Sequence, residues 1–281
     1  MCMISIRQQL YSLDSPRVMA IINITPDSFA FSCRSMTEEE VLTTASLALA
    51  NGADILDIGG CSTRPNAEAV TEEEEWCRVD MGLRVIKRAF PQAILSLDTS
   101  RPVIAARALE QYGVDIINDV SGGTEAMYEV VAAHRVPYVL THSKMIEGDP
   151  LCAIVDELVR RLDTAHRMGV RDVIIDPGFG FDKTKEQNYA ILAGLEQLRE
   201  MGTHLLVGLS RKSMIYNELN VDSRSEEALV GTAALQMIAL EKGACILRAH
   251  DVCAAKNVIK LYQCLVEHQP KKHTMKYISH Q

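Results

Sequence analysis

The 281-residue sequence has no pair of cysteines spaced as C-x-x-C, although it contains eight cysteines. Zinc modules and thiol redox motifs are built on such pairs, so their absence argues against both. The cysteines are scattered along the chain, at positions 2, 33, 61, 77, 152, 245, 253 and 264. Scattered cysteines fit reduced thiols, and we expect a cytoplasmic protein.

A long apolar run and an excess of basic residues are also absent. No stretch approaches the roughly 20 apolar residues that cross a bilayer, and the N-terminus lacks the continuous apolar region of a secretion signal. The net charge of −8 leaves no basic footprint for nucleic acid. We therefore expect no membrane or nucleic-acid partner, but a small-molecule substrate. An anionic substrate would need a local cluster of cations, because the overall charge repels it.

Eight short apolar runs are present, each suited to a buried parallel strand. They fall at about 17–23, 53–58, 93–98, 114–118, 136–141, 171–176, 204–209 and 244–249. Stretches with apolar residues at helical spacing alternate with them, at 37–51, 71–90, 101–112, 124–134, 151–169, 184–201, 224–242 and 252–267. The length is also close to the roughly 250 residues of such a fold. The pattern predicts an α/β protein made of a single (β/α)8 TIM barrel domain over 1–281, with its core at about 17–267.

Almost every predicted strand ends in a polar or charged residue. These residues are Asn23, Asp57, Asp98, Asn118, His142, Asp176, Lys212, Arg248 and His250. In this fold the carboxyl ends of the strands and the loops after them build the active site. Function is therefore sought at these positions, and long polar loops at 24–36, 59–70, 143–150 and 210–223 are expected at the rim of the site.

Two acids end strongly apolar strands, Asp98 in ILSLD and Asp176 in DVIID. They could cap nearby loop amides, or they could accept hydrogen bonds from the N–H groups of a bound heterocycle. We favour the heterocycle, because acids at barrel strand ends are usually functional. Asn118, in IIND, adds an amide that both donates and accepts, which suits a ring edge of mixed polarity.

Basic residues follow the last two strands, in GLSRKS at 208–213 and ILRAHD at 246–251. They supply four potential donors: Arg211, Lys212, Arg248 and His250. An ordinary solvated rim is the alternative, but barrels commonly bind phosphate at this place, so an anionic phosphate-like group is favoured. Asp57 is interpreted as a structural support for the first two loops. A metal-binding role for His142 is not favoured, since no partnered histidine or cysteine accompanies it.

Together these motifs resemble the dihydropteroate synthase family of pterin-binding barrels. The resemblance covers about 17–265 and follows the family order: NITPDSF, DIGG-STRP, LDTS, INDVSGG, DPGFGFDKT, GLSRKS and RAHD. It implies a (β/α)8 barrel, a homodimer and a reaction that joins a pterin-methyl diphosphate to para-aminobenzoate with loss of pyrophosphate. Mg²⁺ is the implied cofactor. No Ser–His–Asp or Cys–His signature is required, because no residue needs to be a strong nucleophile.

The resemblance also implies a role for each matching residue. The pterin would be bound by Asp98, Asn118, Asp176 and Lys212. The diphosphate would be bound by Asn23, Thr63, Arg248 and His250, with Asn23 as the Mg²⁺ ligand. The para-aminobenzoate pocket would be shaped by Phe29, Arg64, Pro65 and Ser213. The catalytic residues would be Lys212, Asp98 and Arg248.

The chain departs from the family pattern at three places. Cys61 and Asn66 flank STRP where the family usually has Glu and Gly, and the first loop reads AFSCRSM in place of an acid and two glycines. The fifth strand ends THSKM, so Thr141 and Lys144 are expected to alter the wall on the pterin side. Two rival functions remain open: a methyltetrahydrofolate-dependent corrinoid methyltransferase, against which SRKS and RAHD argue, and a catalytically idle pterin-binding or scaffold protein.

Overall fold

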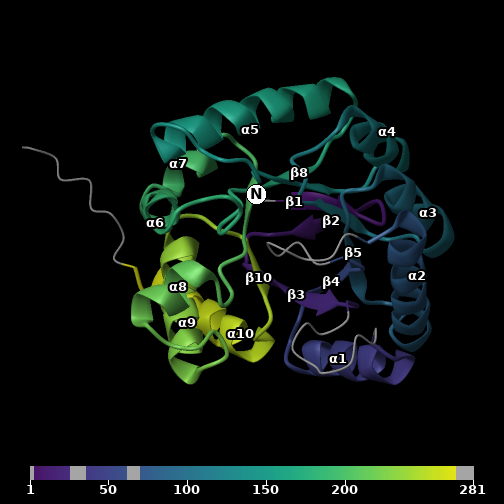
Figure 1. The fold of residues 1–281 in the computed structure, drawn as a ribbon, viewed down its shortest axis with the longest axis horizontal. Coiled ribbons are helices and arrows are strands. Elements are labelled where there is room, and N and C mark those ends of the chain that lie inside the picture. The colour runs from purple at the N-terminus through teal and green to yellow at the C-terminus, as the bar shows by residue number, and fades with distance from the viewer. Residues whose placement is uncertain (1–2, 26–35, 62–69, 270–281) are drawn as a thin grey trace, which may run out of the picture.

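Eight parallel strands close into a barrel in the order β10-β3-β4-β5-β6-β7-β8-β9, and helices surround it (Figure 1). This computed structural model describes residues 3–25, 36–61 and 70–269. The barrel strands are β3 (Arg17–Asn23), β4 (Ile55–Gly59), β5 (Ile94–Asp98), β6 (Ile116–Asp119), β7 (Tyr138–Thr141), β8 (Val173–Asp176), β9 (His204–Val207) and β10 (Ile246–Ala249). The predicted (β/α)8 barrel is confirmed.

Helices follow the strands along the chain. They are α1 (Glu38–Ala50), α2 (Glu72–Ala89), α3 (Pro102–Tyr112), α4 (Glu125–His134), α5 (Pro150–Arg167), α6 (Lys185–Ala193), α7 (Glu196–Arg199), α8 (Ser213–Leu219), α9 (Glu226–Glu241) and α10 (Val252–Glu267). Several begin at side-chain caps that the sequence signals; Thr37, for example, forms a full capping box with Glu40.

The structure corrects the predicted elements at two places. The helix expected over 184–201 is two helices, α6 and α7, which Gly194 separates. A Cβ atom at Gly194 would lie 2.2 Å from Leu151 Cδ1, so the chain packs tightly against α5 where the helix breaks. The loop expected over 210–223 contains the short helix α8, which buries Met214 and Ile215.

A hairpin of β1 (Met3–Ile6) and β2 (Gln9–Ser12) precedes the barrel and was not predicted. Its two turn residues, Arg7 and Gln8, have φ of 51° and 62°. Positive φ at both positions is typical of a type I′ turn, which usually carries Asn or Gly. The hairpin was missed because neither residue gives that signal.

The hairpin closes one end of the barrel. Residues at alternate positions along the barrel strands belong to one core cluster, which includes Met19, Ile55, Ile116 and Ile174. Ile4, Ile6 and Leu13 of the N-terminal segment belong to the same cluster. Their strand neighbours pack outward against the helices in the main core cluster. Because side chains alternate along a strand, the first set fills the barrel interior and the hairpin covers it.

Polar contacts fix the hairpin to the strand starts. Arg7 forms two hydrogen bonds with Asp115, at 2.8 and 3.0 Å. Ser5 N donates to Asp172 at 2.9 Å, and the His204 ring lies 2.9 Å from the Met3 carbonyl oxygen. The apolar interior and the hairpin thus occupy the amino ends of the strands, which leaves the carboxyl ends for a site.

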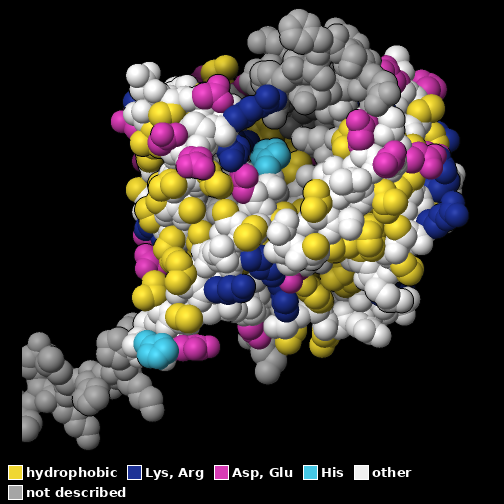
Figure 2. Space-filling view, turned by 90° about the horizontal axis from the view of Figure 1, so that it is seen from below, with side chains coloured by type: hydrophobic (Ala, Val, Ile, Leu, Met, Phe, Trp, Pro, Cys, Tyr) yellow, Lys and Arg dark blue, Asp and Glu magenta, His cyan; other side chains and the backbone are white. Residues whose placement is uncertain are grey.

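On the face shown in Figure 2, acidic and basic side chains are interspersed, and basic side chains with a histidine gather beside a hollow at the upper edge. None of the helices in the described part of the chain is both long and apolar enough to cross a membrane.

The hairpin's role as a cover predicts the effect of truncating its side chains. Ile4 is 0% exposed, so Ile4→Ala removes buried methyl groups and should lower the free energy of unfolding by about 2–4 kcal/mol. Leu10 on the same hairpin is 79% exposed, and Leu10→Ala should change stability by less than about 0.5 kcal/mol. Urea unfolding measures both. Similar values for the two variants would show that the hairpin does not cover the core.

Candidate functional site

An arginine held between two carboxylates lies at the carboxyl end of the barrel. Arg248 on β10 donates from Nε to Asp57 Oδ2 at 2.7 Å and from Nη2 to Asp98 Oδ2 at 2.6 Å. Asn118 Nδ2 donates to the same Asp57 oxygen at 2.9 Å. Four of the barrel strands therefore meet in one polar cluster, and three of its members were predicted as site residues.

Burial and charge set the protonation of this cluster. Burial raises the pKa of Asp98 to about 7, with Arg248 opposing the shift and Asp57 adding to it. Burial lowers the pKa of Arg248, but the two carboxylates outweigh this effect and hold it above its ordinary value. Arg248 thus stays a cation, and the charged form of Asp98 depends on that cation.

The strand register places the predicted residues in one row. Asn23, Gly59, Asp98 and Asn118 are successive partners across β3, β4, β5 and β6. A Cβ atom at Gly59 would lie 3.4 Å from Asn23 Oδ1 and 3.6 Å from Asp98 Cβ, so the glycine keeps the space between them open. Asn23, although exposed, therefore belongs to the same surface as the buried acid.

Asp176 lies at the end of β8, in register with Thr141 on β7. Its Oδ1 accepts a hydrogen bond from Gly178 N at 2.8 Å, so the loop-capping role that the sequence left open is present. Burial raises its pKa, while the Gly178 amide, Lys212 and Arg248 oppose the shift. Lys183 opposes the shift as well, so three cations influence this buried acid, which makes it a candidate ligand group.

Two lysines approach the loop after β8. Lys212 lies with Nζ 4.8 Å from the centre of the Phe181 ring, a cation–π contact, and its Cδ would lie 3.1 Å from a Cβ at Gly180. Lys183 donates to the carbonyl oxygens of His142, Gly178 and Phe181 at 2.8, 2.9 and 3.2 Å. Burial lowers the pKa of Lys183 to about 8. Lys183 was not predicted as a site residue, although it lies within the DPGFGFDKT motif.

The four basic donors after β9 and β10 do not all converge. Arg211 forms two hydrogen bonds with Asp251, at 2.8 and 3.1 Å, and donates to the carbonyl oxygens of Ser223 and Ser225. Its guanidinium therefore ties loops together. His250 is exposed, and its Nδ1 lies 3.1 Å from Ser210 Oγ.

The remaining predicted positions are either near the surface, buried, or outside the described residues. Ser213 is exposed at the start of α8, beside Lys212. Four predicted site residues lie outside the described residues: Phe29, Thr63, Arg64 and Pro65. Lys144 pairs with Glu157 on α5 at 3.0 Å with its side chain 59% exposed, whereas Thr141 is fully buried. Of these two departures from the family pattern, Thr141 is the one whose side chain lies inside the barrel.

Asp57 was predicted as a support for the first two loops, and its contacts give it a larger role. Asp57 is fully buried and binds both Arg248 and Asn118, so it belongs to the site and is more than a support for loops. The alternation of side chains in ILDIG was the available signal in the sequence, because it puts Asp57 on the same side of the strand as Gly59.

Burial lowers the pKa of His142 to about 4, which keeps the ring neutral. No cluster of three metal-binding side chains occurs among the described residues.

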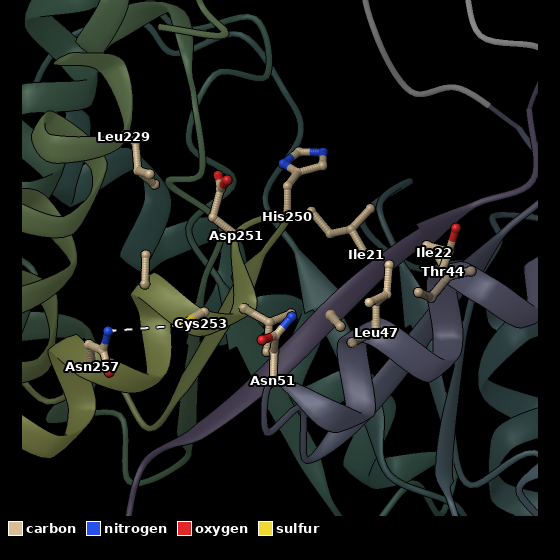
Figure 3. Close-up of a pocket in the computed structure, with 14 residues that line it drawn as sticks. Ile21, Ile22, Thr44, Leu47, Asn51, Leu229, His250, Asp251, Cys253 and Asn257 are labelled. Atoms are coloured by element: carbon tan, nitrogen blue, oxygen red, sulfur yellow. Dashed lines mark hydrogen bonds between the residues drawn. The ribbon is translucent and has the colours of Figure 1, made fainter. Parts of the chain in front are cut away.

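A separate pocket lies outside the barrel, between α1 and α10 (Figure 3). Its volume is about 540 Å³, and the residues that line it include Ile21, Leu47, Asn51, Leu229 and Asn257. The buried acids of the barrel do not line it, and His250 is the predicted site residue that does. The barrel mouth, and not this pocket, is the candidate active site.

Comparison with known proteins places this arrangement in a family. The family model described as "Pterin binding enzyme" matches residues 19–250. The dihydropteroate synthase of Clostridium beijerinckii is 38% identical over 256 residues, which cover 89% of this chain and 94% of that protein.

Solved structures agree with the sequence comparison. The dihydropteroate synthase of Xanthomonas albilineans with 4-aminobenzoic acid superimposes with a TM-score of 0.85 at 37% identity, covering 95% of this chain and 99% of that one. A complex of the Xanthomonas enzyme with 7,8-dihydropteroate gives 0.84 at 32% identity, covering 96% and 100%.

The charge cluster predicts a pH-dependent loss of stability. Arg248→Met leaves Asp57 and Asp98 facing each other without a cation, and at pH 7 it should lower the free energy of unfolding by about 3–5 kcal/mol. Losing the cation raises the folded-state pKa of Asp98 further above its ordinary value. The folded variant then takes up the Asp98 proton at a higher pH than the wild type does, so its deficit should be larger at pH 9 than at pH 7. Urea unfolding at both pH values tests this; an equal deficit would contradict the assignment.

Proposed function

The chain belongs to the pterin binding enzyme family, and we propose that it acts as a dihydropteroate synthase. The reaction condenses 6-hydroxymethyl-7,8-dihydropterin diphosphate with para-aminobenzoate to give 7,8-dihydropteroate and pyrophosphate. The observation that carries the proposal is the buried acid–amide row at the barrel mouth, next to the cations Arg248 and Lys212. This arrangement suits a polar heterocycle that carries an anionic group.

The pterin ring would lie against Asp98, Asn118, Asp176 and Lys212. A pterin presents adjacent N–H donors on its pyrimidine edge, which carboxylates accept in pairs. Burial raises the pKa of Asp176, and Lys212 and Arg248 oppose that shift, which favours the carboxylate form that accepts hydrogen bonds. Asn118 Nδ2 is already engaged with Asp57, which directs the amide oxygen of Asn118 to another donor.

The diphosphate would lie nearer the rim, against Asn23, Thr63, Arg248 and His250. Arg248 donates to Asp98, so its guanidinium would lie between the proposed positions of the ring and of the leaving group. Loss of pyrophosphate leaves positive charge on the pterin methylene, which the electron-rich ring and the nearby carboxylates stabilise. The aryl amine of para-aminobenzoate then attacks the methylene and releases a proton to solvent. Lys212, Asp98 and Arg248 are the residues proposed to act on the reacting groups.

Mg²⁺ is the proposed cofactor, with Asn23 as its protein ligand. Mg²⁺ usually takes one or two protein oxygens together with substrate phosphates and water, so a single amide oxygen at the rim fits such a site. Bound there, the ion would neutralise charge on the departing pyrophosphate. Asn23 itself would orient the diphosphate, because its Oδ1 faces the space above Gly59.

The para-aminobenzoate pocket is proposed at Phe29, Arg64, Pro65 and Ser213. Xanthomonas structures with 4-aminobenzoic acid and with 7,8-dihydropteroate support both the substrate and the product. We also propose a homodimer in the cytoplasm. Exposed apolar side chains on α9 and α10, among them Val230 at 68% and Leu261 at 62%, offer a surface for a second copy.

Pyrophosphate release tests the function directly. The purified protein, given the pterin diphosphate and Mg²⁺, should release pyrophosphate at a rate that depends on para-aminobenzoate. A corrinoid methyltransferase or an idle pterin-binding protein would bind pterin without this dependence. No stimulation by para-aminobenzoate would reject the proposed reaction.

The role of Asp176 predicts a loss of pterin affinity. Asp176→Asn replaces an acceptor by a donor opposite the pterin N–H groups, and it should weaken pterin binding by roughly 2–4 kcal/mol. Asp182→Asn, a nearby change of the same type outside the cluster, is the control. Calorimetry with a pterin lacking the diphosphate measures both. Unchanged affinity in the first variant would remove Asp176 from the site.

The position of His250 predicts selective loss of diphosphate binding. His250→Ala should weaken binding of the pterin diphosphate by roughly tenfold, the scale of one charge-assisted hydrogen bond, and leave the pterin alcohol unaffected. Its side chain is exposed and lies outside the carboxylate cluster, so the ring contacts persist. Equal losses for the two ligands would contradict this placement.

A further inference from the structure

A half-buried lysine in the β8 loop (residues 177–184) donates all of its ammonium N–H groups to the protein. Lys183 Nζ donates to the carbonyl oxygens of His142, Gly178 and Phe181, at 2.8, 2.9 and 3.2 Å. A lysine ammonium has three N–H donors and no acceptor. The three carbonyl oxygens account for all three donors, so Lys183 keeps none for a substrate and acts on the protein itself.

The three acceptors come from the ends of two neighbouring strands. His142 directly follows β7, whereas Gly178 and Phe181 lie in the β8 loop. His142 N in turn donates to the Asp176 carbonyl oxygen at 2.9 Å, and Gly178 N donates to Asp176 Oδ1 at 2.8 Å. The Lys183 ammonium therefore completes a ring of contacts around the residue that ends β8.

Two glycines let the β8 loop follow this path. Gly178 has a φ of 67°, and a Cβ atom there would collide with the His142 carbonyl oxygen. Gly180 has a φ of 82°, and its N–H donates to Asn188 Oδ1 at 2.8 Å. Asn188 on α6 is 2% exposed and also donates from Nδ2 to the Lys183 carbonyl oxygen at 3.2 Å. The loop is thus held by α6 on one side and by the Lys183 ammonium on the other.

The β8 loop in turn forms the surface on which Lys212 lies. Lys212 Nζ is 4.8 Å from the centre of the Phe181 ring, whose face attracts a cation. A Cβ atom at Gly180 would lie 3.1 Å from Lys212 Cδ and 3.5 Å from its Nζ, so the lysine chain runs closely along the loop backbone. The position of the Lys212 ammonium therefore depends on the loop conformation that Lys183 fixes.

Lys183 also brings a second positive charge to the same acid. Burial lowers the pKa of Lys183 to about 8, an effect that Asp176 opposes and the charge of Lys212 adds to. A pKa of about 8 leaves Lys183 mainly charged at pH 7, so it donates as an ammonium. Two ammonium groups that repel each other in a partly buried place are costly, and such groupings are typical of functional sites.

We infer that Lys183 is a positioning residue of the pterin site: it fixes the β8 loop, and through that loop the side chain of Lys212, without touching the substrate itself. The inference rests on the proposed synthase function, in which Lys212 and Asp176 bind the pterin. The charge of Lys183 adds a smaller effect in the same direction, because a nearby cation favours the carboxylate form of Asp176. Lysine suits the position, since no neutral side chain supplies three donors from one atom.

A double-mutant cycle tests the inference, in calorimetry with a pterin lacking the diphosphate. Lys183→Met keeps an unbranched chain but removes the three donors, and it should weaken pterin binding by about tenfold, the scale of one charge-assisted hydrogen bond. In a Lys212→Met background the same change should cost no more than about threefold, because the group that Lys183 positions is gone. Lys185→Met is the matched control: Lys185 is exposed and pairs with Glu218, and its loss should change pterin affinity by less than about twofold.

A milder variant covers the case in which Lys183→Met does not fold. Lys183→Gln keeps two N–H donors without the charge, so it should lose less affinity than Lys183→Met, and the same cycle with Lys212→Met applies to it. A merely structural role would lower the free energy of unfolding and leave the pterin affinity of the folded variant unchanged.

Two outcomes would overturn the inference: unchanged pterin affinity in the Lys183 variants, or an equal loss of affinity with and without Lys212. Failure of the synthase proposal is recognised separately. In that case the wild-type protein binds the pterin but shows no pyrophosphate release that depends on para-aminobenzoate, and the comparison of affinities still decides the role of Lys183. A wild-type protein that binds no pterin would reject both proposals.

Discussion

The ion pair of one arginine with two carboxylates is the constraint on which the barrel mouth depends. Arg248 and Asp98 are 150 residues apart in sequence and 2.6 Å apart in space, which only closure of the barrel achieves. Two acids at adjacent strand ends would repel each other in this buried place. The guanidinium offsets the repulsion between the two carboxylates, and its planar set of N–H donors fixes the position of one carboxylate relative to the other. The site geometry is thus a consequence of β10 closing the sheet beside β3.

The architecture and the row of strand ends could be predicted because both follow from local pattern. Buried parallel strands read as continuous apolar runs, and the residue that ends each run marks the site. The hairpin at Arg7 and Gln8 could not be predicted in this way, since these residues adopt positive φ without the usual turn composition. The packing of Gly194 against Leu151, which splits a predicted helix, is a tertiary contact and leaves no local signal either.

Which acid pairs with which cation was also beyond the sequence. Arg211 and Arg248 both stand at strand ends in basic motifs, yet Arg211 adopts a φ of 51° and turns to Asp251, whereas Arg248 lies on a strand and points into the barrel. Glu75 is one of four acids in the first turn of α2, yet it is 3% exposed. Its burial depends on how α2 packs against β4, and periodicity along one helix does not reveal that contact.

The interior of the barrel changes character along its axis. The part of the interior at the amino ends of the strands is apolar and is closed by the hairpin. Nearer the carboxyl ends, three buried side-chain atoms have no hydrogen-bond partner among the described residues: Asp57 Oδ1, Ser96 Oγ and Thr141 Oγ1. Asp57 and Ser96 are partners in the strand register, so two of these atoms belong to one layer. Each unpaired group costs about 1–3 kcal/mol. A ligand whose donors reach this layer would recover part of that cost, so the polarity that weakens the fold is also what favours binding of a heterocycle.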